Sequence, residues 1–159
     1  MPTPPLIDWS ALDLERTVVT HEEIYSVCRQ SGRLALLDGL LRFTPRGEVI
    51  VGYKDVRGDQ WWAPDHIPGR PIFPGVLMVE AAAQLCTFDF MHRRDDIGAD
   101  FVGFAGLDAV RFRGVVAPPA RMVFAGQVKR LRQGMFTYSA QGFVEGRMVF
   151  EAQILGVVV

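Results

Sequence analysis

The segment that decides the fold spans residues 66–84 and reads His66-Ile-Pro-Gly-Arg-Pro-Ile-Phe-Pro-Gly-Val-Leu-Met-Val-Glu-Ala-Ala-Ala-Gln84. Proline has no backbone N–H and blocks a helix interior, so the prolines up to Pro74 rule out a continuous helix there. From Pro74 or Gly75 to about Arg94 the pattern becomes helical and is apolar on nearly every face. A helix of that kind is buried all round, so we expect other elements to wrap around it.

The rest of the chain favours strands. Residues 1–19 are expected to form a loosely structured N-terminal arm, and Thr20 and Glu23 have the spacing of a capping box that begins a helix from His21 to about Gln30. Apolar or alternating runs predict strands, separated by turn residues, over 34–43, 48–56, 101–112, 121–131, 136–144 and 148–158. We therefore predict one α+β domain over residues 1–159, with a long central helix wrapped by a mostly antiparallel sheet.

Composition narrows the classes of function. The chain is 49% hydrophobic and 22% charged, with a formal net charge of -1, so it has no basic excess for nucleic-acid binding. Two distant cysteines and three scattered histidines predict neither a disulfide framework nor a metal site, and a cytoplasmic location is expected. The N-terminus does not resemble a signal peptide. The longest apolar stretch, from Pro74 to Met91, is interrupted by polar residues and predicts no membrane span.

Three features of residues 66–84 suggest proton-transfer chemistry. His66 lies on a loop whose prolines would orient the ring for use as a general base, although a loop histidine bonded to the backbone is the alternative. Glu80 has apolar neighbours and shares its face only with Gln84, so its carboxyl could be buried and act as an acid, or form a structural pair with Gln84. The N–H of Gly75, at the helix start, could stabilise a developing negative charge or simply begin the helix.

This segment resembles the 3-hydroxyacyl-[acyl-carrier-protein] dehydratases of the FabZ type, which have a hotdog fold. The family pattern, approximately His-Phe-Pro-Gly-x-Pro-x-x-Pro-Gly-Val-Leu-x-x-Glu-Ala-x-Ala-Gln, is matched throughout except at Ile67. The likeness extends to residues 36–38 and 104–113, and so covers roughly residues 20–158. Glu80 stands where the related dehydratase/isomerases have aspartate.

The resemblance implies that the chain converts 3-hydroxyacyl thioesters into trans-2-enoyl thioesters in fatty-acid or related biosynthesis. His66 would remove the C2 proton, Glu80 would assist loss of the hydroxyl, Gly75 would polarise the thioester carbonyl and Gln84 would support the site. The family forms homodimers in which His66 and Glu80 of one site come from different chains, and often trimers of dimers. No cofactor is implied beyond the phosphopantetheine of the acyl-carrier protein.

An acyl-carrier protein is acidic, so its docking surface should be basic. Arg111 and Arg113 match the family's Arg-Phe-Arg segment and are the first candidates. Further candidates lie at the end of the long helix and on a later strand, namely Arg93, Arg94, Lys129, Arg130 and Arg132. Ordinary solvated arginines are the alternative interpretation of each.

The chain departs from the family pattern in three places. Asp65 precedes the histidine where glycine is usual, and it could bond His66 or point to solvent. Residues 29–34 replace a Pro-His-Arg-Tyr-Pro-Phe stretch, and Phe101 follows a loop that lacks the family's tyrosine. Two alternatives therefore remain open: a different hotdog enzyme, such as an enoyl-CoA hydratase or thioesterase, and a non-catalytic acyl-binding subunit.

Overall fold

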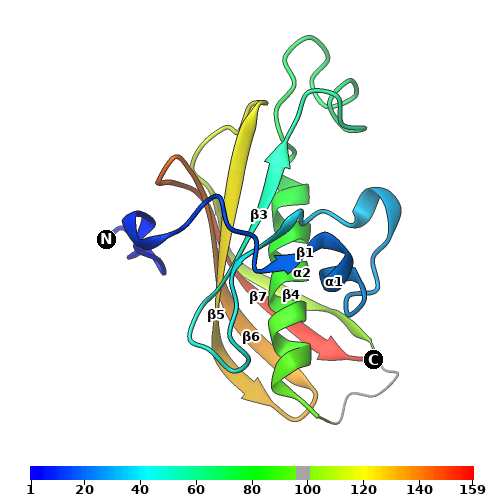
Figure 1. The fold of residues 1–159 in the computed structure, drawn as a ribbon, viewed down its shortest axis with the longest axis vertical. Helices are drawn as coiled ribbons and strands as arrows, with labels where there is room; N and C mark the ends of the chain where they lie inside the picture. Colours follow the sequence, from blue (N-terminus) through cyan, green and yellow to red (C-terminus); the bar gives the residue numbers. More distant parts are fainter. Residues whose placement is uncertain (96–100) are drawn as a thin grey trace.

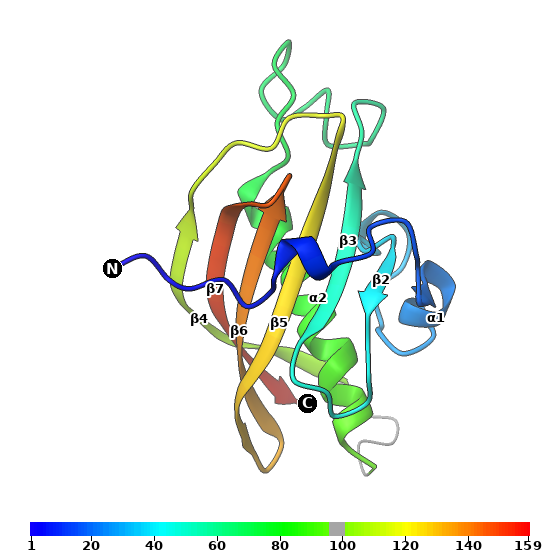
Figure 2. The ribbon, with the colours of Figure 1, turned by 60° about the vertical axis from the view of Figure 1, so that its left-hand side comes forward.

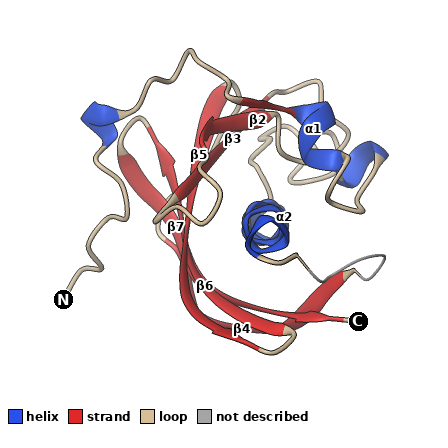
Figure 3. Ribbon diagram, turned by 60° about the horizontal axis from the view of Figure 1, so that its bottom comes forward, coloured by secondary structure: helices blue, strands red, loops and turns tan. Residues whose placement is uncertain are grey.

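Helix α2 (Gly75–Arg93) lies in the concave side of a curved, seven-stranded antiparallel sheet in this computed structural model, which describes residues 1–95 and 101–159 (Figures 1 and 3). The strand order is β1-β2-β3-β5-β6-β7-β4. The strands are β1 (Val19–Thr20), β2 (Gly39–Arg42), β3 (Ile50–Val56), β4 (Val102–Phe112), β5 (Ala120–Arg132), β6 (Met135–Val144) and β7 (Arg147–Val158). The short helices are α1 (His21–Tyr25) and the 3-10 turns η1 (Trp9–Ala11) and η2 (Gly32–Leu34).

The prediction of a long buried helix is confirmed. Ala81, Ala82, Leu85 and Cys86 in the middle of α2 have no exposed surface, because strands lie on one side of them and the segment around α1 on the other. Leu77 N and Met78 N both donate to Pro74 O, which fixes the first turn. None of the helices in the described part of the chain is long and apolar enough to cross a membrane.

The predicted C-terminal hairpins are also present. The turn between β5 and β6 contains Gly134 at φ 71°, and the turn between β6 and β7 contains Glu145 at φ 50° and Gly146 at φ 78°. Left-handed backbone of this kind matches the twist of paired strands, which is why such residues connect hairpins. The strands after residue 101 begin and end within one or two residues of the prediction.

Two elements are shorter than the sequence predicts. Helix α1 has the expected capping box but ends at Tyr25 instead of Gln30. The hydroxyl of Ser26 donates to Glu23 O, and such local bonds compete with helix continuation. Strand β2 begins only at Gly39, because Leu34 and Leu36 bond to the side chain of Gln84 instead of a neighbouring strand.

The N-terminal arm crosses the sheet on the face opposite α2 (Figure 2). The side chain of Gln141 holds it by accepting from Leu6 N at 2.7 Å and donating to Pro4 O at 3.0 Å. The arm covers a second apolar cluster on this outer face, whose buried members are Ile7, Leu41, Val51, Tyr53, Val123, Ala125 and Phe143. The arm that was expected to be loosely structured is therefore an ordered segment packed across the outer face of the sheet.

Candidate active site

His66 lies on the loop between β3 and α2, and its ring has a defined orientation. Its Nδ1 is 2.8 Å from Ile72 O, and its backbone N donates to Trp62 O, also at 2.8 Å. A carbonyl can only accept, so Nδ1 carries the hydrogen and Nε2 is left as the nitrogen that can take up a proton. The next residue, Ile67, has φ 57°, a strained conformation for a β-branched side chain of the kind often found at functional sites.

The loop is anchored at both of its ends. At its start, Gln60 accepts from Trp62 Nε1 at 3.2 Å and donates to Asp55 O at 3.0 Å. At its end, Phe73 N donates to Val116 O at 2.7 Å, and the Phe73 ring packs edge-on against Trp62. These contacts fix the path of a segment that has no regular secondary structure.

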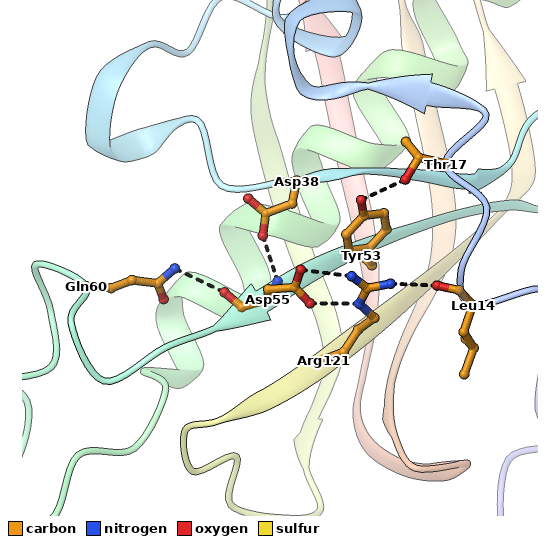
Figure 4. A network of polar contacts seen from close by, with 7 residues as sticks. All are labelled: Leu14, Thr17, Asp38, Tyr53, Asp55, Gln60 and Arg121. Carbon is orange, nitrogen blue, oxygen red and sulfur yellow. Dashed lines mark hydrogen bonds and ion pairs between the residues drawn. The ribbon is translucent and has the colours of Figure 1, made fainter.

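The anchor at Gln60 continues into a polar network that reaches the N-terminal arm (Figure 4). Arg121 forms a two-pronged ion pair with Asp55, at 2.7 and 2.9 Å, and also donates to Leu14 O. Its guanidinium lies 4.1 Å from the centre of the Tyr53 ring. The arm, the sheet and the loop that bears His66 are thus connected through one arginine.

Glu80 lies one and a half turns into α2 and is half-buried, not fully buried as the sequence suggested. Gln84 Nε2 donates to Glu80 Oε1 at 2.9 Å and to Leu34 O at 2.7 Å. Gln84 Oε1 accepts from the hydroxyl of Tyr25 and from Leu36 N. One carboxylate oxygen of Glu80 is thereby held, and no hydrogen bond from the described residues occupies the other.

Sequence reasoning missed the role of Tyr25. Its hydroxyl accepts from Leu37 N at 2.8 Å and donates to Gln84, so it orients the amide that orients Glu80. Burial raises the pKa of the Tyr25 phenol well above its ordinary value, so the hydroxyl remains a donor even at alkaline pH. The capping box that begins α1 was the only local signal near this residue.

A cavity of about 160 Å³ adjoins Glu80 between α2 and the sheet. Its lining residues are Gln30, Glu80, Ala83, Thr87, Val102, Gly103, Phe104, Phe136, Ile154, Leu155 and Gly156. His66 is not among them, and no hydrogen bond joins His66 to Glu80 within the described part of the chain. Among the described residues, the two predicted catalytic side chains therefore share neither a hydrogen bond nor this cavity.

Gly75 begins α2, as predicted, and its lack of a side chain leaves room for the ring of Phe112. A Cβ at this position would lie 2.8 Å from the ring of Phe112 on β4. Its N–H belongs to the first turn, where backbone donors have no acceptor within the helix. The position is thus closely packed on one side and has a donor to offer on the other.

The charged candidates differ in availability. Arg111 and Arg113 are both exposed, but Arg113 is paired with Glu151 at 2.8 Å, a contact that lowers the pKa of that carboxyl. Arg93 pairs at 2.6 Å with the buried Asp89, so its guanidinium is a structural group and not an available docking residue. Asp65 is exposed, and the partner of His66 Nδ1 is Ile72, not Asp65.

Possible metal ligands were compared among the described residues. There, no cluster of three or more histidine, cysteine, aspartate or glutamate side chains could hold a metal ion. Cys28 and Cys86 are both buried thiols, and burial raises the pKa of Cys28 to about 12.

Several known proteins are similar to this chain in sequence or in structure. A family profile described as a FabA-like domain matches residues 30–153. The 3-hydroxyacyl-[acyl-carrier-protein] dehydratase FabZ of Desulfotalea psychrophila is 34% identical over 121 residues, which are 76% of this chain and 80% of the relative. The protein of the same name from Syntrophobacter fumaroxidans is 36% identical over 123 residues, covering 77% of this chain and 82% of the relative.

A solved structure has the same fold. The dehydratase heterocomplex ApeI:P from Xenorhabdus doucetiae aligns over 86% of this chain and 90% of that chain, with a TM-score of 0.72 and 14% sequence identity. At this identity the likeness concerns the fold alone. It confirms the hotdog fold that the family resemblance implied.

The fold and the matched profile thus place this chain in the class of hotdog-fold proteins with a FabA-like domain. Within it, the chain belongs to the family of FabZ-type 3-hydroxyacyl-[acyl-carrier-protein] dehydratases, because its named relatives share about a third of their residues with it over most of both chains. The predicted enzyme class is confirmed, and the relatives favour it over another hotdog enzyme or a non-catalytic subunit.

Proposed function

We propose that two copies of this chain together dehydrate 3-hydroxyacyl groups presented by an acyl-carrier protein, with His66 of one copy and Glu80 of the other at each site. The observation that carries this proposal is the separation of two prepared groups. His66 has an oriented ring with Nε2 as its proton acceptor, and Glu80 has an oriented carboxyl beside a cavity that His66 does not line.

Strand β4 supports a second copy as the missing component. It pairs with β7 on one side and lies at the edge of the sheet, and its burial pattern is largely exposed. Phe104, Leu107 and Phe112 on this strand are 50%, 43% and 53% exposed. An apolar edge strand favours pairing with another strand, and an identical copy would continue the antiparallel sheet.

The chemistry follows from the two side chains. Nε2 of His66 takes the C2 proton, the electrons of that C–H bond form the C2=C3 double bond, and the C3–O bond breaks. Glu80 gives a proton to the departing hydroxyl, which leaves as water. His66 then releases its proton to solvent and Glu80 takes one up from solvent, so both groups return to their starting forms. The N–H of Gly75 would stabilise negative charge on the thioester oxygen while C2 loses its proton.

The substrate and setting follow from the family. The acyl chain would enter the cavity beside Glu80, carried on the phosphopantetheine of the carrier protein, and no further cofactor is needed for proton transfer. Arg111 and Arg113 would face the acidic carrier protein, with Arg111 the more available of the two. We expect a cytoplasmic homodimer in fatty-acid biosynthesis, and a trimer of dimers as its larger assembly.

Mixing two inactive variants tests the shared site. His66→Ala and Glu80→Gln should each abolish formation of the enoyl thioester, followed by its absorbance. When the two are co-refolded, half of the dimers are mixed, and each mixed dimer has one intact site, so about a quarter of wild-type activity should return. No recovery would place both groups in one chain, and full activity of either single variant would refute its catalytic role.

A further inference from the structure

The cavity beside Glu80 is short. It follows α2 from Glu80 past Ala83 to Thr87, which is about 10 Å at a rise of 1.5 Å per residue. Its volume is about 160 Å³.

Phe136 of β6 closes the end that is distant from Glu80. Its ring packs against Phe90 of α2, with ring centres 4.6 Å apart, and it is only 3% exposed. On the sheet side, a Cβ added to Gly156 would lie 2.1 Å from Cζ of Phe136. The ring therefore spans the space from helix to sheet, and it can do so only because residue 156 has no side chain.

Toward Met91 the cavity continues only through a narrow hollow, beyond which lies a wider one lined by residues 25–31 and Met91. The adjoining hollow, which shares Gln30, Thr87 and Val102 with the cavity, has a volume of only about 20 Å³. Oε1 of Gln30 is buried there, with no hydrogen-bond partner in the described part of the chain. An alkyl chain pushed past this oxygen would keep it unpaired, which is unfavourable.

We propose that Phe136, seated on Gly156, sets the maximum acyl length, and that the substrates are therefore short-chain 3-hydroxyacyl thioesters. This inference rests on the proposed function, since it assigns the cavity to the acyl chain of the reacting thioester. Phe136 is a specificity residue and takes no part in the proton transfers.

The test compares kcat/KM for 3-hydroxybutyryl, 3-hydroxyoctanoyl and 3-hydroxydodecanoyl thioesters. Wild-type protein should prefer the two shorter substrates. Phe136→Ala should raise the ratio of dodecanoyl to butyryl activity by about tenfold or more, the effect of a few methylene groups in an apolar pocket. Phe136→Leu should shift the ratio in the same direction with less loss of packing, and serves if the alanine variant unfolds.

A second variant should act in the opposite direction. Gly156→Ala displaces the ring into the cavity and should lower the ratio of octanoyl to butyryl activity. Phe143→Ala is the matched control, because Phe143 is also buried on β6 but belongs to the outer cluster. It should leave the length profile unchanged.

The outcomes separate this inference from the proposed function. A wild-type preference for the dodecanoyl substrate, or an unchanged profile in both Phe136 variants, would overturn the chain-length assignment and leave the dehydratase intact. Turnover of no thioester of any length would overturn both.

Discussion

Glu80 depends for its orientation on Gln84, the side chain one helical turn later. The carboxamide of Gln84 is 1% exposed and has four partners: Leu34, Leu36, Tyr25 and Glu80. An amide can make four hydrogen bonds, so this group is fully satisfied and cannot rotate without leaving a buried partner unpaired. The pairing with Gln84 therefore serves structure and chemistry together.

This network makes Tyr25 a positioning residue for Glu80. Tyr25→Phe removes the hydroxyl that donates to Gln84 and accepts from Leu37 N. We expect kcat to fall by about tenfold with little change in KM, because supporting bonds of this kind are typically worth 10- to 100-fold. The pH profile of kcat should also shift, which a purely structural residue would not cause. Steady-state kinetics across pH measures both.

A tyrosine on the outer face provides the control. The hydroxyl of Tyr53 bonds to Thr17 at 2.8 Å and is not among the partners of Gln84 or Glu80. Tyr53→Phe should therefore leave both kcat and its pH profile unchanged. Wild-type kinetics in Tyr25→Phe would show that Glu80 is held without it.

The sequence offers His66, Gly75, Glu80 and Gln84 as candidate site residues because they lie within one short segment whose spacing suits proton transfer. Tyr25 could not, because it is 59 residues away from Gln84 and only the fold brings them together. The same limit applies to the assembly of the site, since a linear pattern does not say whether His66 and Glu80 meet within one chain.

At the scale of elements, the side chain of Gln141 attaches the first residues of the N-terminal arm to the sheet. Gln141 is 2% exposed, and its amide bonds to the backbone of Leu6 and Pro4. Without these bonds the arm retains the contacts of Leu14 with Arg121 and of Thr3 with Glu151, but Leu6 N and Pro4 O lose their partner.

Gln141→Leu should therefore loosen the arm. The substitution preserves size but removes two partly buried hydrogen bonds, so we expect the free energy of unfolding to fall by about 1–3 kcal/mol. Urea unfolding measures this, and limited proteolysis should cut within the first residues sooner. Gln153→Leu, on an exposed position of β7, should change neither. Equal stability of the two variants would mean that the apolar contacts alone hold the arm.

Helix α2 and the last three strands were predictable because their signals are local: continuous apolar composition, alternation and turn residues. The short β2 and the position of the arm were not. Leu34 and Leu36 satisfy their backbone groups through Gln84, and the arm lies on the sheet through Gln141 and Arg121, all distant in sequence. Local sequence patterns therefore predict where a helix or strand lies, but not which distant segment it contacts.

For the whole molecule, the apolar edge at β4 and the divided catalytic groups lead to the same conclusion. Phe112 on this strand also packs against Gly75 at the start of α2, so the edge and the helix start form one continuous region. A partner on β4 would approach the place where the proposed oxyanion donor lies. Assembly and activity should therefore be lost together.

Leu107→Glu tests this coupling. A charge on the 43% exposed side chain at the edge of β4 should prevent pairing of two copies, since like charges would meet across the interface. We expect a folded monomer by light scattering and circular dichroism, with activity reduced at least about tenfold because each site lacks half of its groups. Leu131→Glu, at a 47% exposed position on β5, is the control and should remain an active oligomer. A Leu107→Glu monomer with full activity would mean that one chain contains a complete site, in contradiction to the separation of His66 from the cavity of Glu80.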